Sequence, residues 1–365
     1  MHFYENELKA LKRSGRYRTR EVVSPAIYDF ASNDYLGLAH KKELHTKTCE
    51  ELSSHEIHSS KASMLVNGYH QIHKDFEDAL CKANDFEAAI VLGSGFNANI
   101  ALIEALVRKG DTLFIDELYH ASGILATNLE SVNVVFFKHN DMAELRCLLE
   151  KSHAQRKLIA VEGIYSMDGD LCPREVFSIA DETGSILIVD EAHSSGVIGK
   201  NLMGVFDHYN IKIKQNYIKM GTLGKAYGSF GAFILASEHI VEYLLNRAKP
   251  IIYATSLSLY DTLLAHNSLR YIIKHTQDLK KQIQIRQDII QKELGVEVQG
   301  LIVPLLIADN TKVIKIKNEL FELGFGVGGI RQPTVPSAIV RLIARLGEDE
   351  VVLEKLCKHL LKMTR

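Results

Sequence analysis

Short apolar runs alternate with amphipathic stretches through most of the chain, starting near residue 72. The spacing over 72–84 and 97–110 predicts two helices on either side of a strand at 87–95, and Gly110 is a helix stop signal. More β-rich runs follow, separated by stretches of helical length: 111–116, 132–138, 157–166, 185–192, 217–223 and 231–237. Strands that alternate with helices predict a mostly parallel sheet, and such continuously apolar strands indicate that both faces are covered.

The two ends of the chain have different patterns. Residues 3–13 predict a short helix, and residues 28–39 predict a strand and a turn. After Pro250 we expect a long helical segment at 257–294, a strand at 301–307, a helix at 311–323, a Gly-rich turn at 324–329, a strand at 338–345 and a helix at 348–362. We therefore predict an α/β protein with an N-terminal segment (1–45), a large domain (46–245) and a smaller C-terminal α/β domain (246–365).

Residues that suit catalysis or phosphate binding follow the predicted strands where they end. They are Gly95, His120, Ser166, Asp168, Asp190, His193, Thr222 and Lys225. In a doubly wound sheet the ligand binds at the carboxyl ends of the strands. A glycine turn that opens a helix suits a phosphate, although such a turn alone is more often only structural. A lysine and an acid suit pyridoxal 5′-phosphate (PLP), which needs a lysine for its Schiff base and an acidic partner for its ring nitrogen.

The run Asp-Glu-Ala-His at 190–193 is also a helicase signature. A helicase requires a phosphate-binding loop in which Gly-Lys is followed by Ser or Thr. Here Lys200 is followed by Asn201 and Lys225 by Ala226, which argues against a nucleic-acid ATPase. A dinucleotide-binding dehydrogenase is also disfavoured, because no G-x-G-x-x-G follows an early strand.

Composition narrows the class of protein further. The chain has 365 residues, of which 46% are hydrophobic, and 43 basic residues against 45 acidic ones give a net charge of −2. That balance argues against a general binder of nucleic acid or of membrane surfaces. The five cysteines show no C-x-x-C spacing, so we expect reduced thiols and no metal site. The N-terminus lacks an apolar signal-peptide region, and the longest uncharged run, 88–103, is too short to span a bilayer, so we expect a soluble cytoplasmic protein.

Motifs spread over nearly the whole chain resemble the α-oxoamine synthases, which are PLP-dependent enzymes. These motifs are SNDYLGL (32–38), LVNGYHQIHKDFE (65–77), LGSGFNAN (92–99), DELYHAS (116–122), EGIYSMDGD (162–170), DEAHSSGVIG (190–199), GTLGKAYGSFG (221–231), YATS (253–256) and IRQPTVPSA (330–338). The resemblance implies the aminotransferase-like PLP fold type I, with a mostly parallel sheet in a large domain and a smaller C-terminal α/β domain. It also implies a homodimer with shared sites.

Within this family, the IRQPTVP motif and the short chain are most similar to members that serve biotin synthesis. That resemblance implies condensation of L-alanine with a pimeloyl thioester, carried on CoA or acyl carrier protein, with release of CO2 and the thiol. Two alternatives stay open. One is a relative that uses glycine or serine, and the other is a PLP-fold protein retained for binding, with little activity of its own.

The resemblance implies a role for each matching residue around the cofactor ring. Lys225 would hold the cofactor covalently and move protons, and Asp190 would pair with the ring nitrogen. His193 would hydrogen-bond the phenolic oxygen, and Ser166 would hold the same edge. His120 would stack on the ring and orient the substrate.

Other matching positions would surround the phosphate and the substrates. Gly95, Phe96 and Thr222 would lie at the phosphate, with Thr255 supplied by the neighbouring subunit. The substrate-side positions are Arg18, Asn33, His120 and Thr334.

Two positions depart from the family pattern. The biotin-pathway members usually have an arginine for the amino acid carboxylate at a position where this chain has Ile343. Arg341 and Arg345 share a strand face with Ile343, so either of them, or Arg331, could serve instead. The family also tends to have an arginine where this chain has Met64, which could alter how the acyl group or its carrier docks.

Overall fold

The computed structural model describes residues 2–14, 16–128 and 133–364. Its central sheet has seven strands in the order β2-β8-β7-β6-β5-β3-β4. Their bounds are β2 (Ala88–Leu92), β3 (Thr112–Asp116), β4 (Asn133–Phe137), β5 (Lys157–Glu162), β6 (Ile186–Asp190), β7 (Tyr217–Thr222) and β8 (Ala232–Ala236). Only β8 runs antiparallel to its neighbours, so the predicted mostly parallel sheet is confirmed. Val132, the first residue of one predicted strand, lies outside the described residues.

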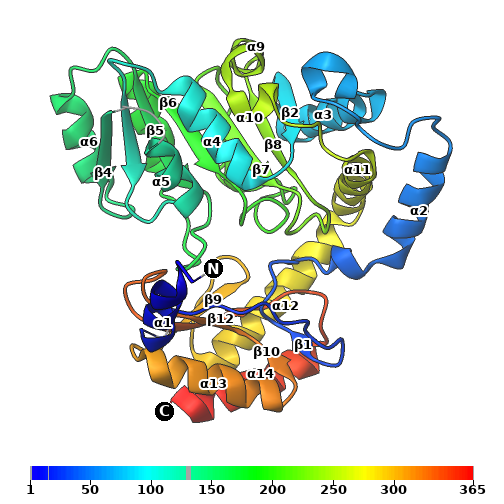
Figure 1. Cartoon of the computed structure of the whole chain (residues 1–365), viewed down its shortest axis with the longest axis vertical. Helices are drawn as coiled ribbons and strands as arrows, with labels where there is room; N and C mark the ends of the chain where they lie inside the picture. The colour runs from blue at the N-terminus through cyan, green and yellow to red at the C-terminus, as the bar shows by residue number, and fades with distance from the viewer. Residues whose placement is uncertain (1, 15, 129–132, 365) are drawn as a thin grey trace.

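Helices cover both faces of this sheet (Figure 1). One face packs against α4 (Gly95–Leu106), α5 (Ala121–Thr127), α9 (Glu238–Arg247) and α10 (Lys249–Ile252). The other face packs against α3 (Gln71–Asn84), α6 (Met142–Lys151), α7 (Glu175–Thr183) and α8 (Val205–His208). Successive residues of a strand alternate between the two cores: Ile188 belongs to the first, and Leu187 and Val189 to the second. This double burial explains why the strands read as continuous apolar runs.

A smaller lobe lies beneath the sheet in Figure 1. It contains an antiparallel sheet of β11 (Gly328–Ile330), β12 (Ile339–Ile343) and β9 (Ile302–Leu306), with α12 (Thr276–Leu294), α13 (Asn310–Glu322) and α14 (Glu350–Thr364). The region predicted as a Gly-rich turn forms β10 (Phe325–Gly326) and the start of β11. Strand β10 pairs in parallel with β1 (Tyr28–Asp29), so residues near the N-terminus extend this lobe.

The helical segment expected over 257–294 is two helices, α11 (Leu259–Lys274) and α12. They are separated by His275, whose φ of −108° and ψ of 18° leave the helical region. The hydroxyl of Thr276 donates to the carbonyls of Ile272 and Ile273, which satisfies acceptors at the end of α11. Helix α11 packs on α2 (Lys42–Ser53) and α3, whereas α12 packs on α14, so the break lies where the chain passes between the lobes. The domain boundaries at 45 and 245 stay predictions.

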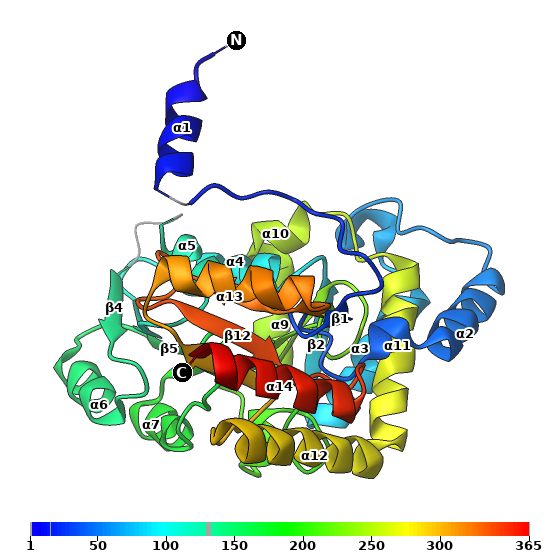
Figure 2. The same ribbon diagram turned by 90° about the horizontal axis from the view of Figure 1, so that it is seen from below.

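The N-terminal helix α1 (Glu5–Arg13) projects away from the rest of the molecule (Figure 2), and none of its residues is buried. Short helical turns occur at η1 (Leu38–His40) and η2 (Met64–Gly68). All five cysteines are free thiols. No helix within the described ranges is both long and apolar enough to cross a membrane.

Candidate active site

A cavity of about 210 Å³ lies at the carboxyl ends of β5, β6 and β7, beside the start of α4. Its lining residues are Gly95, Phe96, Asn99, His120, Glu162, Asp190, Ala192, His193, Met220, Thr222 and Lys225. The structure thus brings together the four predicted catalytic residues and three further predicted cofactor contacts, Gly95, Phe96 and Thr222. Parallel strands explain this grouping, because their carboxyl ends meet at one edge of the sheet.

Lys225 and His193 face each other in this cavity. The Lys225 Nζ and the His193 Nε2 lie 2.8 Å apart. Burial lowers the pKa of Lys225 to about 8, although the nearby carboxyl of Asp190 acts in the opposite direction. Burial, together with the positive charges of Lys225 and Arg341, also holds the pKa of His193 far below its ordinary value. The lowered pKa increases the share of Lys225 that is an uncharged amine near neutral pH, the form that acts as a nucleophile and a base.

Asp190 is held in place by neighbours that the sequence analysis did not select. Its carboxylate accepts hydrogen bonds from the side chain of Asn99 at 2.9 Å and from the backbone N–H of Ala192 at 3.0 Å. The Tyr119 hydroxyl donates to Asn99 Oδ1 at 2.7 Å and so fixes the amide orientation. Asn99 is completely buried within α4. A polar residue that follows a glycine turn in a largely apolar helix was the available signal for this role.

His120 begins α5 and separates this cavity from a larger one. Its Nδ1 accepts the backbone N–H of Ser122 at 3.3 Å and lies 2.7 Å from the Ser122 hydroxyl. Because Nδ1 is an acceptor, the ring proton lies on Nε2, which is free to face a ligand. Burial lowers the pKa of His120, so its ring is neutral near pH 7.

Thr222 and the start of α4 form the end of the cavity that suits a phosphate. Buried Thr222 Oγ1 has no hydrogen-bond partner among the described residues. Helix α4 begins at Gly95, and the Ser94 side chain caps only the N–H of Asn97, so other N–H groups of the first turn stay available. A Cβ on Gly95 would lie 2.5 Å from Thr222 Cγ2, so a side chain there would fill the cradle. These features fit the phosphate of PLP.

Glu162 is a second carboxyl in the cavity, and the sequence analysis did not select it. Its Oε2 accepts the backbone N–H of Ser166 at 3.1 Å, and its buried Oε1 has no partner within the described part of the chain. Burial, and then the neighbouring Asp190 carboxylate, raise the pKa of Glu162 well above its ordinary value. Burial beside Asp190 therefore favours the neutral form of Glu162.

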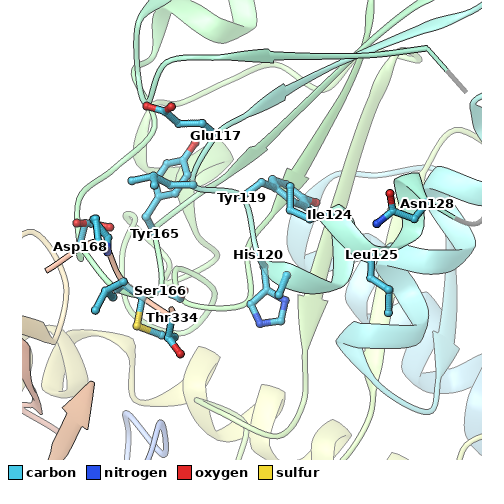
Figure 3. A pocket seen from close by; sticks show the side chains of 15 residues that line it. Glu117, Tyr119, His120, Ile124, Leu125, Asn128, Tyr165, Ser166, Asp168 and Thr334 are labelled. Carbon is cyan, nitrogen blue, oxygen red and sulfur yellow. The ribbon is translucent and has the colours of Figure 1, made fainter. Parts of the chain in front are cut away.

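The larger cavity, of about 490 Å³, opens on the other side of His120. Figure 3 shows His120 and Leu125 pointing the same way, with Ser166 and Thr334 to one side. Apolar side chains, including Leu118 and Leu125, form much of its wall. The predicted residues Ser166 and Thr334 line this cavity and do not line the smaller one.

Arg341 is the arginine that reaches the site. Its Nε donates to the carbonyl of Ser166 at 2.7 Å, and its Nη2 donates to Asn33 Oδ1 at 3.1 Å. Arg345 is instead paired with Asp29 and Asp34, and Ile343 is fully buried.

The remaining predicted residues lie farther out. Arg18 and Thr334 border a third cavity of about 240 Å³, together with Arg331. Thr255 is exposed, does not line the first cavity, and forms an isolated bridge with Ser63. Met64 begins the turn η2 and packs against the core that contains α4.

Outside the cavity, His139 bridges two carboxylates, those of Asp116 and Asp170, and so forms a charged clamp between the segments that follow β3 and β5. His139 Nδ1 lies 3.1 Å from the carboxylate of Asp116, and its Nε2 lies 2.8 Å from that of Asp170. Its ring also meets the edge of Tyr165, with centroids 4.3 Å apart. Asp116 ends β3, which leads to His120, and Asp170 follows the loop that carries Ser166.

Comparison with known proteins agrees with this geometry. Residues 25–360 match the family of class I and II aminotransferases, and an 8-amino-7-oxononanoate synthase of Helicobacter pylori strain J99 is 42% identical over 364 residues. The chain belongs to the class I and II aminotransferase family. The alignment with the Helicobacter pylori relative covers 99% of this chain and 98% of that one. An 8-amino-7-oxononanoate synthase of Geobacter sulfurreducens is 35% identical, with 96% of this chain and 94% of that one covered.

Solved structures of related enzymes share the fold. An 8-amino-7-oxononanoate synthase from Francisella tularensis has a TM-score of 0.76 at 26% identity, covering 93% of this chain and 97% of that one. A serine palmitoyltransferase from S. paucimobilis, solved with a bound PLP–myriocin aldimine, has a TM-score of 0.89 at 22% identity, covering 99% and 96%. The predicted fold type I is confirmed. The predicted resemblance to α-oxoamine synthases, and to the 8-amino-7-oxononanoate synthases among them, is confirmed as well.

Proposed function

We propose that this protein is a PLP-dependent 8-amino-7-oxononanoate synthase. It would condense L-alanine with a pimeloyl thioester of CoA or acyl carrier protein, giving 8-amino-7-oxononanoate, CO2 and the free thiol, as a cytoplasmic step of biotin synthesis. One observation carries the proposal: Lys225, Asp190, His193 and His120 surround a single cavity whose far end suits a phosphate. Relatives 42% identical over nearly the whole chain carry this enzyme's name.

The cavity residues divide between the two ends of the proposed cofactor. When bound, PLP supplies an electron sink that stabilises negative charge at the α-carbon of the amino acid. Lys225 would hold it covalently and Asp190 would pair with its ring nitrogen, while His193 would meet the phenolic oxygen. Gly95, Phe96 and Thr222 would bind its phosphate, with Ser166 at the ring edge and His120 over the ring face.

The chain's own groups would then handle the protons and the substrates. The Lys225 amine, with its pKa lowered to about 8, is suited to take the α-proton and later return one. Arg341 would bind the carboxylate of L-alanine, beside Asn33. A carbon–carbon bond forms between the α-carbon and the thioester carbonyl as the carbon–sulfur bond breaks. The bond to the carboxylate then breaks and CO2 leaves.

The outer cavities would accommodate the thioester. The apolar cavity beside His120 and Leu125 suits the methylene chain of a pimeloyl group. The third cavity, with Arg18 and Arg331, would take anionic groups of the substrate or its carrier, with Thr334 between the two cavities.

We further propose a homodimer. Thr255 is too far out to line the first cavity of its own chain, and large apolar side chains are exposed near it and near α4, including Tyr253 (80%), Val66 (78%) and Phe96 (45%). A second copy that covers these side chains would also bring its Thr255 to the phosphate end.

Two assays test the function. The cofactor-loaded protein is titrated with L-alanine, glycine and L-serine while its visible spectrum is recorded, and thiol release from pimeloyl-CoA is then followed with each amino acid. We expect the tightest spectral response and the fastest thiol release with L-alanine, and neither with Lys225→Ala. A preference for glycine or serine would move the substrate within the family. Cofactor uptake without turnover would leave a binding protein, and no uptake at all would refute the proposal.

A further inference from the structure

A buried tyrosine, Tyr35, contacts the ring nitrogen of His193 that lies opposite the one facing Lys225. The Tyr35 hydroxyl lies 2.5 Å from His193 Nδ1, and the opposite ring atom, Nε2, lies 2.8 Å from Lys225 Nζ. Tyr35 is completely buried. The two contacts form one hydrogen-bonded line from Tyr35 through the imidazole to Lys225.

The imidazole of His193 is neutral, so it carries one proton that can lie on either nitrogen. Burial, followed by the neighbouring side chains of Lys225, Arg341 and His120, holds the pKa of His193 far below its ordinary value. These residues and Tyr35 are the titratable groups that face it. The position of the single proton decides whether Nε2 offers the cavity a donor or an acceptor.

Distances indicate that Tyr35 is the donor in its contact with Nδ1. The hydroxyl has two candidate acceptors, His193 Nδ1 at 2.5 Å and Asn33 Oδ1 at 3.3 Å. The contact with Nδ1 is much the shorter of the two, so the hydroxyl proton is better placed on the line to Nδ1. Asn33 Oδ1 already accepts from Arg341 Nη2 at 3.1 Å. Burial also raises the pKa of the Tyr35 hydroxyl, so it keeps its proton.

The backbone around Tyr35 is fixed by the C-terminal lobe. The N–H of Leu346 donates to the carbonyl of Tyr35 at 2.9 Å. Arg345 donates to the carbonyl of Asp34 at 3.1 Å and to its carboxylate at 2.5 Å. Tyr35 is therefore held rigidly against His193.

We propose that Tyr35 is a positioning residue that fixes His193 as the Nε2–H tautomer. Once Lys225 has lost its proton, above its lowered pKa of about 8, the Nε2–H donates to the Lys225 amine, and the Nε2–H can also donate to the phenolic oxygen of a bound PLP. The tautomer itself follows from contacts within the chain. Its effect on the cofactor rests on the proposed function.

The tautomer can be measured in the cofactor-free protein by long-range ¹H–¹⁵N NMR after ¹⁵N-histidine labelling. The chain has 16 histidines, and the signals of His193 are assigned by their loss in His193→Asn. At about pH 9.5, where Lys225 with its pKa of about 8 is uncharged, we expect a protonated Nε2 and an unprotonated Nδ1 in the unsubstituted protein. A protonated Nδ1 would overturn the proposal without any tyrosine variant being needed.

Tyr35→Phe tests the cause. We expect it to move the His193 signals toward a mixture of tautomers, because Nδ1 loses its donor. The matched control is Tyr217→Phe, which also removes a buried hydroxyl, one that donates to Asp181 at 2.8 Å near the start of β7. An unchanged tautomer in Tyr35→Phe, or an equal change in Tyr217→Phe, would overturn the proposal.

A second readout uses the cofactor-loaded protein. We expect Tyr35→Phe to shift the pH midpoint of its visible absorption and to lower kcat about tenfold, the effect of losing one hydrogen bond, with a smaller change in KM for the amino acid. A shifted tautomer with an unchanged midpoint would refute the effect on the cofactor. If no PLP is taken up at all, the proposed function fails, whereas the NMR result still decides the tautomer.

Discussion

Replacing His139 by glutamine should weaken the clamp between Asp116 and Asp170. Burial alone would lower the pKa of His139, but its hydrogen bonds with the two carboxylates outweigh burial and raise that pKa to about 10. Both ring nitrogens face carboxylates, so only the doubly protonated ring can donate to both. The amide of glutamine carries no charge and can donate through its nitrogen alone.

The size of the effect follows from the pKa shift. The pKa of His139 rises from 6.5 to about 10. At about 1.36 kcal/mol per pKa unit, the clamp therefore contributes at most about 5 kcal/mol to the free energy of unfolding. The His139 side chain is 21% exposed and that of Asp170 is 40% exposed, so solvent screening reduces this limit, and we expect about 2 kcal/mol. Because the pKa of His139 is raised on folding, its protonated ring contributes its full stabilisation of the folded protein below pH 6.5. This contribution is lost as the pH rises through about 10.

Urea unfolding of the two proteins across this pH range provides the assay. At pH 6 the free energy of unfolding of His139→Gln should be lower by about 2 kcal/mol, and at pH 9.5 the difference should fall below about 1 kcal/mol. The control is His45→Gln, because exposed His45 lies beside the Tyr260 hydroxyl at 2.6 Å; there we expect a change under about 0.5 kcal/mol. A difference that stays the same at both pH values, or a variant as stable as the parent, would refute the charged clamp.

Three further substitutions test the cavity. Gly95→Ala should weaken PLP binding at least about tenfold in a visible-absorbance titration, because the new Cβ would lie 2.5 Å from a Thr222 carbon. The control is Gly93→Ala, which should bind PLP normally, because the nearest atom to its new Cβ lies 3.6 Å away. Arg341→Lys should raise KM for L-alanine about tenfold in steady-state kinetics and change kcat less, because lysine lacks the planar fork that reaches two acceptors. Asn99→Ala leaves the buried Asp190 carboxylate and Tyr119 hydroxyl without a partner, so it should lower the free energy of unfolding in urea by about 1–3 kcal/mol and weaken PLP binding. Unchanged PLP binding would exclude a role for Asn99 in holding Asp190.

The sequence predicted the central sheet closely because its chemistry is local. Each buried strand is an apolar run bounded by turn residues, and β3 and β6 lie inside the ranges expected for them. Strand β10 was taken for part of a turn, because its two residues carry no apolar pattern and it pairs with β1 near the other end of the chain. The break at His275 was not predicted either, since both halves of the segment keep a helical period.

The active-site residues likewise fall into those that the sequence predicted and those that depend on tertiary contacts. Asp190 ends β6, His193 follows it within three residues and Lys225 follows β7 within three residues, so a parallel sheet is enough to bring them together. Glu162 and Asn99 were not selected, because the role of each depends on Asp190, which lies on a different element: Asn99 donates to its carboxylate, and Asp190 helps to raise the pKa of Glu162. Arg341 could not be chosen over Arg345 from the sequence, because both fall on one face of the strand predicted at 338–345, whereas β12 ends at Ile343 and tertiary contacts give the two arginines different partners.

The attachment of residues 28–36 to the C-terminal lobe also constrains the order of folding. Strand β1 pairs with residues 325–326, and Arg345 binds Asp29 and Asp34. During synthesis, the segment that carries Asn33 and Tyr35 therefore lacks its C-terminal partners until residues 325–345 have left the ribosome. The large sheet can form earlier from its own strands, but its active site is completed only when Arg341 joins it.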